Sequence, residues 1–147
     1  MKRILCVCLG NICRSPLAEG VLKAKAHAMN LPLQVASAGT LGFHVGSGAD
    51  KRSVAIGKKY NVDISNHQVQ KFIPEHFDLY DIILVMDRMN LSDVSDMARN
   101  ESDLEKISLY LVDEEVEDPY TGPAEGFEIL YDILEGHAEH WVRRALQ

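Results

Sequence analysis

The sequence has no apolar run long enough to cross a lipid bilayer, which takes about 20 consecutive apolar residues. Its 147 residues are 46% hydrophobic and 25% charged, a balance typical of globular proteins. The first apolar stretch, Ile4 to Gly10, is interrupted by Asn11 and Arg14 too early for a secretory signal. We therefore expect a soluble, single-domain protein over residues 1–147 that does not associate with membranes.

Basic residues are scarce as well. Lysine and arginine total 15 against 22 aspartate and glutamate residues, for a formal net charge of −7. Binding to nucleic acid or to an anionic membrane normally requires a broad positive surface. Both kinds of partner are thus disfavoured, and an anionic ligand would have to be captured by a few local groups.

Only three cysteines occur, Cys6, Cys8 and Cys13. An odd number of cysteines within thirteen residues makes a poor disulfide framework and favours a reducing cytoplasm. Their spacings, one and four intervening residues, do not fit a zinc site, and no paired cysteine or histidine ligands follow. We predict neither a metal nor another cofactor.

Short apolar runs alternate with segments of helical periodicity. Strands are expected over residues 3–7, 33–38, 82–86 and 107–112, and helices over residues 16–29, 50–60, 90–100 and about 127–145. Strands that alternate with helices form right-handed crossovers and a parallel sheet. The sequence therefore predicts an α/β fold.

The stretch CLGNICRSP, residues 8–16, follows the first expected strand. Ligands of open parallel sheets bind outside the carboxyl ends of the strands. A loop that ends at a helix N-terminus offers free backbone N–H groups and the positive end of the helix dipole. Gly10 and Asn11 tolerate the left-handed backbone angles that turn N–H groups inward. We predict an anion site here, suited to phosphate, sulfate or vanadate.

Three side chains of this loop suggest phosphoryl transfer. A helix N-terminus lowers a cysteine pKa from about 8.5 to about 3.5–7.5, so Cys8 is the expected nucleophile. Arg14 has the planar fork that holds phosphate oxygens. Ser15 is the expected N-cap of the helix and a hydrogen-bond donor to the Cys8 sulfur. A turn with inert cysteines is the alternative, but it does not explain arginine and serine at these positions.

The other two cysteines have different expected roles. Cys6 shares a strand face with Ile4 and should pack in the core. For Cys13 two interpretations stay open. It packs beneath the loop, or it forms a reversible disulfide with Cys8 that protects the nucleophile from irreversible oxidation.

A phosphocysteine mechanism also needs an acid for the leaving oxygen and a base for water. Asp118 precedes Pro119 in the stretch EDPY, and the proline keeps it in an extended loop before the last helix. We predict that Asp118 serves as the acid and then as the base. Phe43 and Tyr120 are candidate walls of a slot for a planar substrate group.

Together these residues resemble the low-molecular-weight protein tyrosine phosphatases. The resemblance rests on four motifs in the order of the family: VCLGNICRSP (7–16), SAGT (37–40), VMD (85–87) and DPY (118–120). It implies a single domain with three layers, in which helices cover both faces of a four-stranded, twisted parallel sheet. It also implies a metal-independent hydrolase that acts on phosphotyrosine proteins, among them a bacterial tyrosine kinase.

The resemblance assigns roles to individual residues. Cys8 would be the nucleophile, Arg14 the phosphate clamp and Asp118 the acid and base, with Ser15 stabilising the thiolate. The other positions that it marks are the phosphate loop and its supports, Leu9, Gly10, Asn11, Ile12, Cys13 and His67, and the pocket residues Leu9, Phe43 and Tyr120. Asn11 and His67 would hold the loop in shape.

Three other functions would fit parts of this pattern. An arsenate reductase of the same fold would need further cysteines to relay a disulfide, and none follows Cys13. A phosphate-binding or phosphocarrier module would hold a phosphorylated Cys8 and would have little use for Asp118. A thiol redox switch formed by Cys8 and Cys13 would not depend on Arg14.

Overall fold

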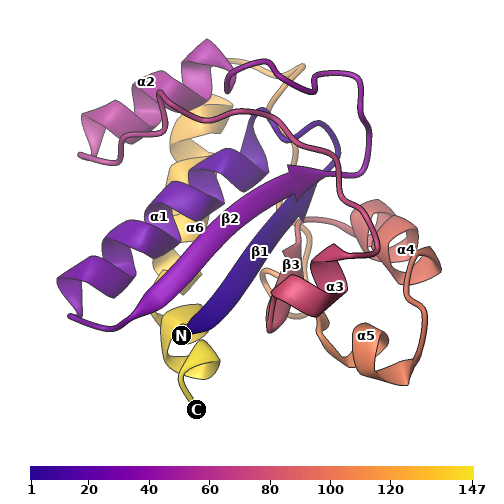
Figure 1. Cartoon of the computed structure of the whole chain (residues 1–147). Coiled ribbons are helices and arrows are strands. Elements are labelled where there is room, and N and C mark those ends of the chain that lie inside the picture. Colours follow the sequence, from indigo (N-terminus) through magenta and orange to yellow (C-terminus); the bar gives the residue numbers. More distant parts are fainter.

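The computed structural model describes residues 1–147 and contains one parallel sheet (Figure 1). Four strands lie in the order β2-β1-β3-β4. Their bounds are Lys2–Cys8 (β1), Leu33–Gly39 (β2), Ile82–Val85 (β3) and Ile107–Leu109 (β4). The expected α/β fold with a four-stranded parallel sheet is confirmed.

The strand β1 lies in the middle of the sheet and pairs on both sides. Its last residue, Cys8, is level with Gly39 of β2, and Val7 is level with Val85 of β3. Because all pairs are parallel, the carboxyl ends of these three strands meet at one edge. That edge places the residues after β1, β2 and β3 within reach of one another.

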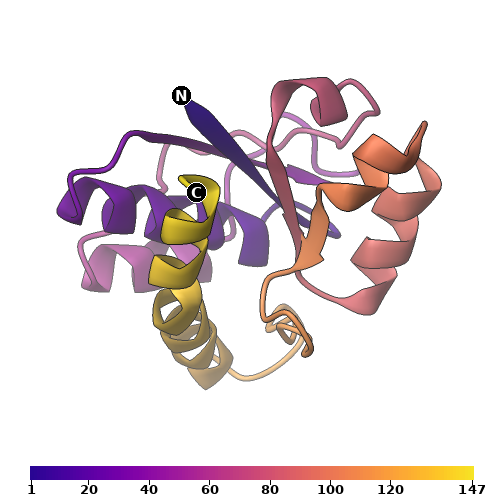
Figure 2. The ribbon, with the colours of Figure 1, turned by 90° about the horizontal axis from the view of Figure 1, so that it is seen from below.

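Helices cover both faces of the sheet (Figure 2). They are α1 (Arg14–Ala28), α2 (Lys51–Lys59), α3 (His76–Leu79), α4 (Arg88–Asp96), α5 (Glu101–Glu105) and α6 (Glu125–Ala145). Figure 2 shows α1, α2 and α6 on one side and α3, α4 and α5 on the other. None of these helices is both long enough and apolar enough to span a membrane.

Two hydrophobic cores follow from the alternation of side chains along β1. Ile4, Cys6 and Cys8 belong to the core under α1 and α6, whereas Leu5 and Val7 belong to the core under α3 and α4. All five residues are at most 3% exposed. A strand covered on both faces is expected to be apolar throughout, as this one is.

Two predicted elements differ from the structure. The helix expected over residues 90–100 ends at Asp96, and a capping box of Asp87 and Asn90 starts it two residues early, at Arg88. A separate helix that was not predicted, α5, follows at Glu101 and is capped by the Asn100 side chain. The strand expected over residues 107–112 ends at Leu109. Beyond it the chain turns, with Val112 at a φ of 69° and its N–H donating to Leu109 O. The four-residue helix α3 was not predicted.

Candidate active site

The loop from β1 to α1 is buried although several of its side chains are polar. Asn11 and Ser15 are fully buried, Arg14 is 2% exposed and Cys8 is 3% exposed. Buried polar groups are costly unless they are hydrogen-bonded. Each of these four side chains makes the contacts described below, so the loop is held in one shape.

The Cys8 sulfur has two polar neighbours. Its Sγ lies 3.0 Å from Ser15 Oγ, and the N–H of Asn11 donates to it at 3.3 Å. The prediction that Ser15 is the N-cap of α1 is wrong. The helix already begins at Arg14, after Cys13, so Ser15 lies in the first turn and its hydroxyl points to the sulfur instead.

Asn11 has the left-handed conformation that the sequence predicts, with φ 56°. Gly10 does not: its φ is not positive, and the nearest atoms to an added Cβ lie at ordinary contact distances. The inward turn of the loop therefore depends on Asn11. Its carbonyl oxygen accepts a hydrogen bond from His67 Nε2 at 2.9 Å, so this nitrogen carries the proton and His67 supports the loop.

The Asn11 amide also orders the hydroxyl beside the Cys8 sulfur. Its Oδ1 accepts from the N–H of Gln70 at 3.0 Å, which fixes the orientation of the amide. Its Nδ2 then donates to Ser15 Oγ at 2.8 Å and to Ser37 Oγ at 3.0 Å. Since Ser15 Oγ accepts this bond, its own proton is free to point to Cys8.

The Ser15 proton has two acceptors within reach. Cys8 Sγ lies at 3.0 Å and Ala38 O at 3.4 Å, at the limit of a hydrogen bond. The sulfur is the closer acceptor, and it is a strong one when ionised. The loop thus directs the Ser15 hydroxyl and the Asn11 N–H at one thiolate position.

Arg14 is fixed from the opposite side of the site. Its Nη1 donates to Asp87 Oδ2 at 2.7 Å and to Val116 O at 2.9 Å, and its Nη2 lies 3.6 Å from Asp118 Oδ2. Asp87 follows β3, and Val116 and Asp118 belong to the loop before α6. Arg14 therefore connects the loop after β1 with the loop of the expected acid.

A cavity of about 130 Å³ lies over the loop. Its lining contains Cys8, Leu9, Gly10, Ile12, Cys13, Arg14, His44, Asp118 and Tyr120. The structure thus brings the expected nucleophile, clamp, acid and aromatic wall to one place. The prediction that Phe43 is a wall of the slot is wrong. Its side chain is 85% exposed and does not line the cavity, whereas the side chain of its neighbour His44 does.

Backbone N–H groups complete the anion site. Those of Gly10, Ile12 and Cys13 donate to no backbone carbonyl, and Arg14 and Ser15 lie in the first turn of α1, where N–H groups have no helical acceptor. A phosphate beside Cys8 would meet these donors, the dipole of α1 and the Arg14 guanidinium. The net negative charge of the chain does not prevent such local capture.

The other two cysteines differ in position, since Cys13 lines the cavity and Cys6 does not. Cys6 is fully buried in the core, as predicted, and burial raises its pKa well above the usual value. Burial, with smaller contributions from Asp50 and Asp118, also raises the pKa of Cys13. All three cysteines are free thiols, and the disulfide between Cys8 and Cys13 stays a prediction.

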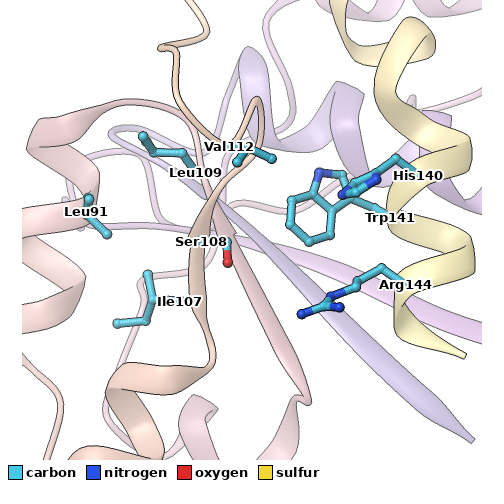
Figure 3. Close-up of a pocket in the computed structure, with 8 residues that line it drawn as sticks. All are labelled: Leu91, Ile107, Ser108, Leu109, Val112, His140, Trp141 and Arg144. Carbon is cyan, nitrogen blue, oxygen red and sulfur yellow. The ribbon is translucent and has the colours of Figure 1, made fainter. Parts of the chain in front are cut away.

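A larger cavity, of about 520 Å³, lies elsewhere, beside the edge strand β4 (Figure 3). It is lined by Leu91, Ile107, Ser108, Leu109, Val112, His140, Trp141 and Arg144. Figure 3 shows Trp141 and Arg144 reaching from α6. The residues that line this cavity include no cysteine, aspartate or glutamate. Chemistry, rather than size, selects the smaller cavity as the active site.

The comparisons with known proteins agree with this geometry. The family model described as Low molecular weight phosphotyrosine protein phosphatase matches residues 3–147. The chain belongs to this family. It is a protein-tyrosine phosphatase and hence a hydrolase, and the resemblance seen in its sequence is confirmed.

Relatives and solved structures match over nearly the whole chain. The Salmonella typhi low molecular weight protein-tyrosine-phosphatase Wzb is 34% identical and covers 97% of this chain and 93% of its own. A protein tyrosine phosphatase structure from Entamoeba histolytica is 33% identical, covers 98% and 96%, and has a TM-score of 0.92. Vibrio vulnificus Wzb in complex with benzylphosphonate is 30% identical, covers 97% and 98%, and has a TM-score of 0.87.

Several residues of the site could not be foreseen from the sequence. Asp87 and Ser37 lie in the motifs VMD and SAGT, which marked their positions without showing what they bind. The contacts of Gln70 with Asn11 and of Val116 with Arg14 span 59 and 102 residues, and no local pattern announces them. His44 had no signal beyond its place beside Phe43.

Proposed function

We propose that the protein hydrolyses phosphotyrosine through a covalent phosphocysteine at Cys8, with Asp118 as general acid and then as general base. One observation carries this proposal: Cys8, Arg14 and Asp118 line a single cavity at a helix N-terminus, and Ser15 Oγ lies 3.0 Å from the Cys8 sulfur. These are the parts that phosphoryl transfer to a thiolate requires.

In the first half of the reaction, the Cys8 thiolate forms a bond to phosphorus while the bond from phosphorus to the tyrosine oxygen breaks. The Asp118 carboxyl gives its proton to that oxygen, so that tyrosine leaves neutral. Arg14 and the N–H groups of the loop bind the three phosphate oxygens that do not leave. Binding substrate would draw the Arg14 Nη2 group, now 3.6 Å from Asp118, toward these oxygens.

In the second half, the Asp118 carboxylate takes a proton from a water molecule. The water oxygen forms a bond to phosphorus, and the bond from phosphorus to sulfur breaks. Inorganic phosphate and the Cys8 thiolate result, and Asp118 is protonated again for the next cycle. The Ser15 hydroxyl and the Asn11 N–H stabilise the returning thiolate, and His67 and Gln70 hold Asn11 in place.

The cavity suits an aromatic phosphate ester. Leu9, Ile12 and Tyr120 give it apolar walls above the anion site, and a relative has been seen with benzylphosphonate, an anion that carries an aromatic ring. We propose phosphotyrosine proteins as substrates, a bacterial tyrosine kinase among them, and phosphate, sulfate or vanadate as ligands of the same site. The three free thiols support a location in the cytoplasm.

Turnover of purified protein tests this function. Steady release of phosphate from phosphotyrosine over many cycles, unaffected by chelators, is expected, with a rate maximum at mildly acidic pH because Cys8 must be ionised while Asp118 is protonated. One equivalent of stable phosphocysteine would instead indicate a carrier. Thiol-dependent arsenate turnover that exceeds ester hydrolysis would indicate a reductase.

A further inference from the structure

The loop that carries Asp118 has no regular structure of its own. It comprises residues 110–124, between β4 and α6, and the Asp118 side chain is 42% exposed. Two residues before Asp118, the Val116 carbonyl accepts from Arg14 and the Val116 N–H donates to Met86 O. The loop is thus anchored on one side of the acid by the phosphate clamp.

A second arginine anchors the loop on the other side. Two residues after Asp118, the Tyr120 carbonyl accepts from Arg52 Nη2 at 3.0 Å. The Arg52 guanidinium also lies 5.5 Å from the centre of the Tyr120 ring and 4.6 Å from that of Phe127, within range of cation–π attraction. Phe127 is buried in the first turns of α6, so the arginine holds the loop against a fixed surface.

Arg52 is itself fixed to the phosphate loop through Asp50. Its Nε and Nη2 donate to the two oxygens of the Asp50 carboxylate at 3.0 and 2.9 Å. The Asp50 N–H donates to Ile12 O at 2.8 Å. A continuous set of contacts therefore runs from the loop of the nucleophile, through Asp50 and Arg52, to the loop of the acid.

We propose that Arg52 is a positioning residue for the general acid: it holds the carboxyl of Asp118 at the leaving-group oxygen by clamping the Tyr120 carbonyl. The proposal rests on the function proposed above. Arg52 does not line the cavity, so it acts through the loop rather than on the substrate. The N–H groups of its guanidinium make hydrogen bonds and the planar face of the guanidinium packs on aromatic rings, whereas a lysine could supply only the charge.

Leaving-group dependence tests this role. We would measure kcat/KM for aryl phosphates whose phenols range from acidic, as in p-nitrophenyl phosphate, to tyrosine itself, because only poor leaving groups need the proton. For Arg52→Ala we expect a loss of roughly tenfold to hundredfold with phosphotyrosine, the scale of a small misplacement of a catalytic group. With p-nitrophenyl phosphate the value should stay close to that of the wild type.

Three further variants complete the test. Arg52→Lys should recover part of the loss. Lys59 lies on the same helix, α2, and pairs with Glu128 away from the cavity. Lys59→Ala should therefore behave as the wild type. In an Asp118→Asn background, Arg52→Ala should add almost nothing, because its effect passes through Asp118. The melting temperature of Arg52→Ala should be close to that of the wild type. Arg52 is partly exposed, and its ion pair with Asp50 therefore adds little stability.

An equal loss for all leaving groups, or a full additional loss in the Asp118→Asn background, would overturn the positioning role. If Arg52→Ala failed to fold, Arg52→Lys would serve as the test. A leaving-group dependence of Arg52→Lys identical to that of the wild type would overturn the proposal. A failure of the proposed function has a different signature. In that case the wild type would not turn over, or Asp118→Asn would itself show no leaving-group dependence, whatever residue stands at position 52.

Discussion

The loop that carries Cys8 and the loop that carries Asp118 meet at one cavity, but they are built in opposite ways. Around Cys8, the polar side chains of Asn11 and Ser15 are fully buried and hydrogen-bonded to one another. Around Asp118, the side chains of Glu117, Asp118 and Tyr120 are exposed. The loop is held by the buried side chains of Val116 and Pro119 and by the carbonyl groups of Val116 and Tyr120. The first arrangement suits the fixed charge of the proposed thiolate, and the second leaves the carboxyl of the proposed acid open to solvent.

The difference follows from what each group must do. A thiolate needs donors that are already in position, because reorganising them during the reaction would cost free energy. A general acid must instead pass its proton to a leaving group and recover one from water, so contact with solvent is useful. Substitutions in the two loops should therefore fail in different ways, and their effects can be ranked.

The largest effect is expected for Cys8→Ser. The serine hydroxyl is a far weaker nucleophile at neutral pH, so turnover of every aryl phosphate should be abolished. Binding of inorganic phosphate, measured by calorimetry, should persist because Arg14 and the loop N–H groups remain. Cys6→Ala is the control, since that thiol faces the core, and it should retain turnover. Substantial hydrolysis by Cys8→Ser would show that the loop binds phosphate without attacking it.

The next effect is expected for Asp118→Asn, which keeps the shape of the side chain and removes the proton. The value of kcat/KM for phosphotyrosine should fall about 10²-fold to 10⁴-fold, the usual contribution of a general acid, and the loss should shrink as the leaving phenol becomes more acidic. The neighbouring exposed carboxylate supplies the control, and Glu117→Gln should leave all substrates unchanged. Equal losses across the series would remove Asp118 from its role.

A smaller effect on activity, with a clear effect on stability, is expected for Asn11→Ala. The change removes one donor from each of the buried hydroxyls of Ser15 and Ser37 and the side-chain acceptor of the Gln70 N–H, and each lost hydrogen bond contributes about 0.5–1.5 kcal/mol. Phosphatase activity should fall roughly tenfold to hundredfold, because the Ser15 proton is no longer directed at the sulfur.

Asn30→Ala is a matched control for that variant. Asn30 has the same φ of 56° as Asn11, but it is exposed and its side chain makes no hydrogen bond. Both variants place alanine in the left-handed region, at a cost of about 1–2 kcal/mol. The difference between their free energies of unfolding, measured in urea, therefore reports the network of Asn11 alone. Equal losses would mean that the backbone conformation, and not the hydrogen bonds, makes Asn11 important.

The sequence predicted the parts of this site that local chemistry determines. The strand β1, the position of Cys8 at its end and the left-handed Asn11 follow from apolar pattern and residue type. Asp118 could be placed in a loop before α6 because Pro119 follows it. These features depend on neighbours in the chain, which a sequence displays directly.

The parts that depend on distant neighbours could not be predicted. Ser15 looked like a helix cap, but the structure uses its hydroxyl for Cys8 because Asn11 reaches it from the side. Phe43 looked like a wall of the slot, yet the loop turns it outward and brings His44 to the cavity. Pairings across 68 residues, such as Arg52 with Tyr120, become visible only once the chain has folded.

The smallest effect is expected where the two loops are tied together, at Asp50. Hydrogen bonds from Arg52 hold the pKa of Asp50 below its usual value. A carboxyl with a lowered folded pKa adds stability above the unfolded pKa of about 3.9, and this stability is lost as the pH falls through the lower folded value. Because Arg52 is partly exposed, the ion pair should contribute little to the stability.

Asp50→Asn tests both this contribution to stability and the link that Asp50 makes between the two loops. Asparagine also caps helices, so α2 should still form. The free energy of unfolding should drop slightly at pH 7 and should depend less on pH below about 4, compared with the wild type. Glu114→Gln, an exposed carboxylate without an ion pair, should leave the pH dependence unchanged. If Asp50→Asn left both the stability and its pH dependence unaltered, the link between the Cys8 loop and the Asp118 loop would depend on Arg14 and the stacking of Arg52 alone.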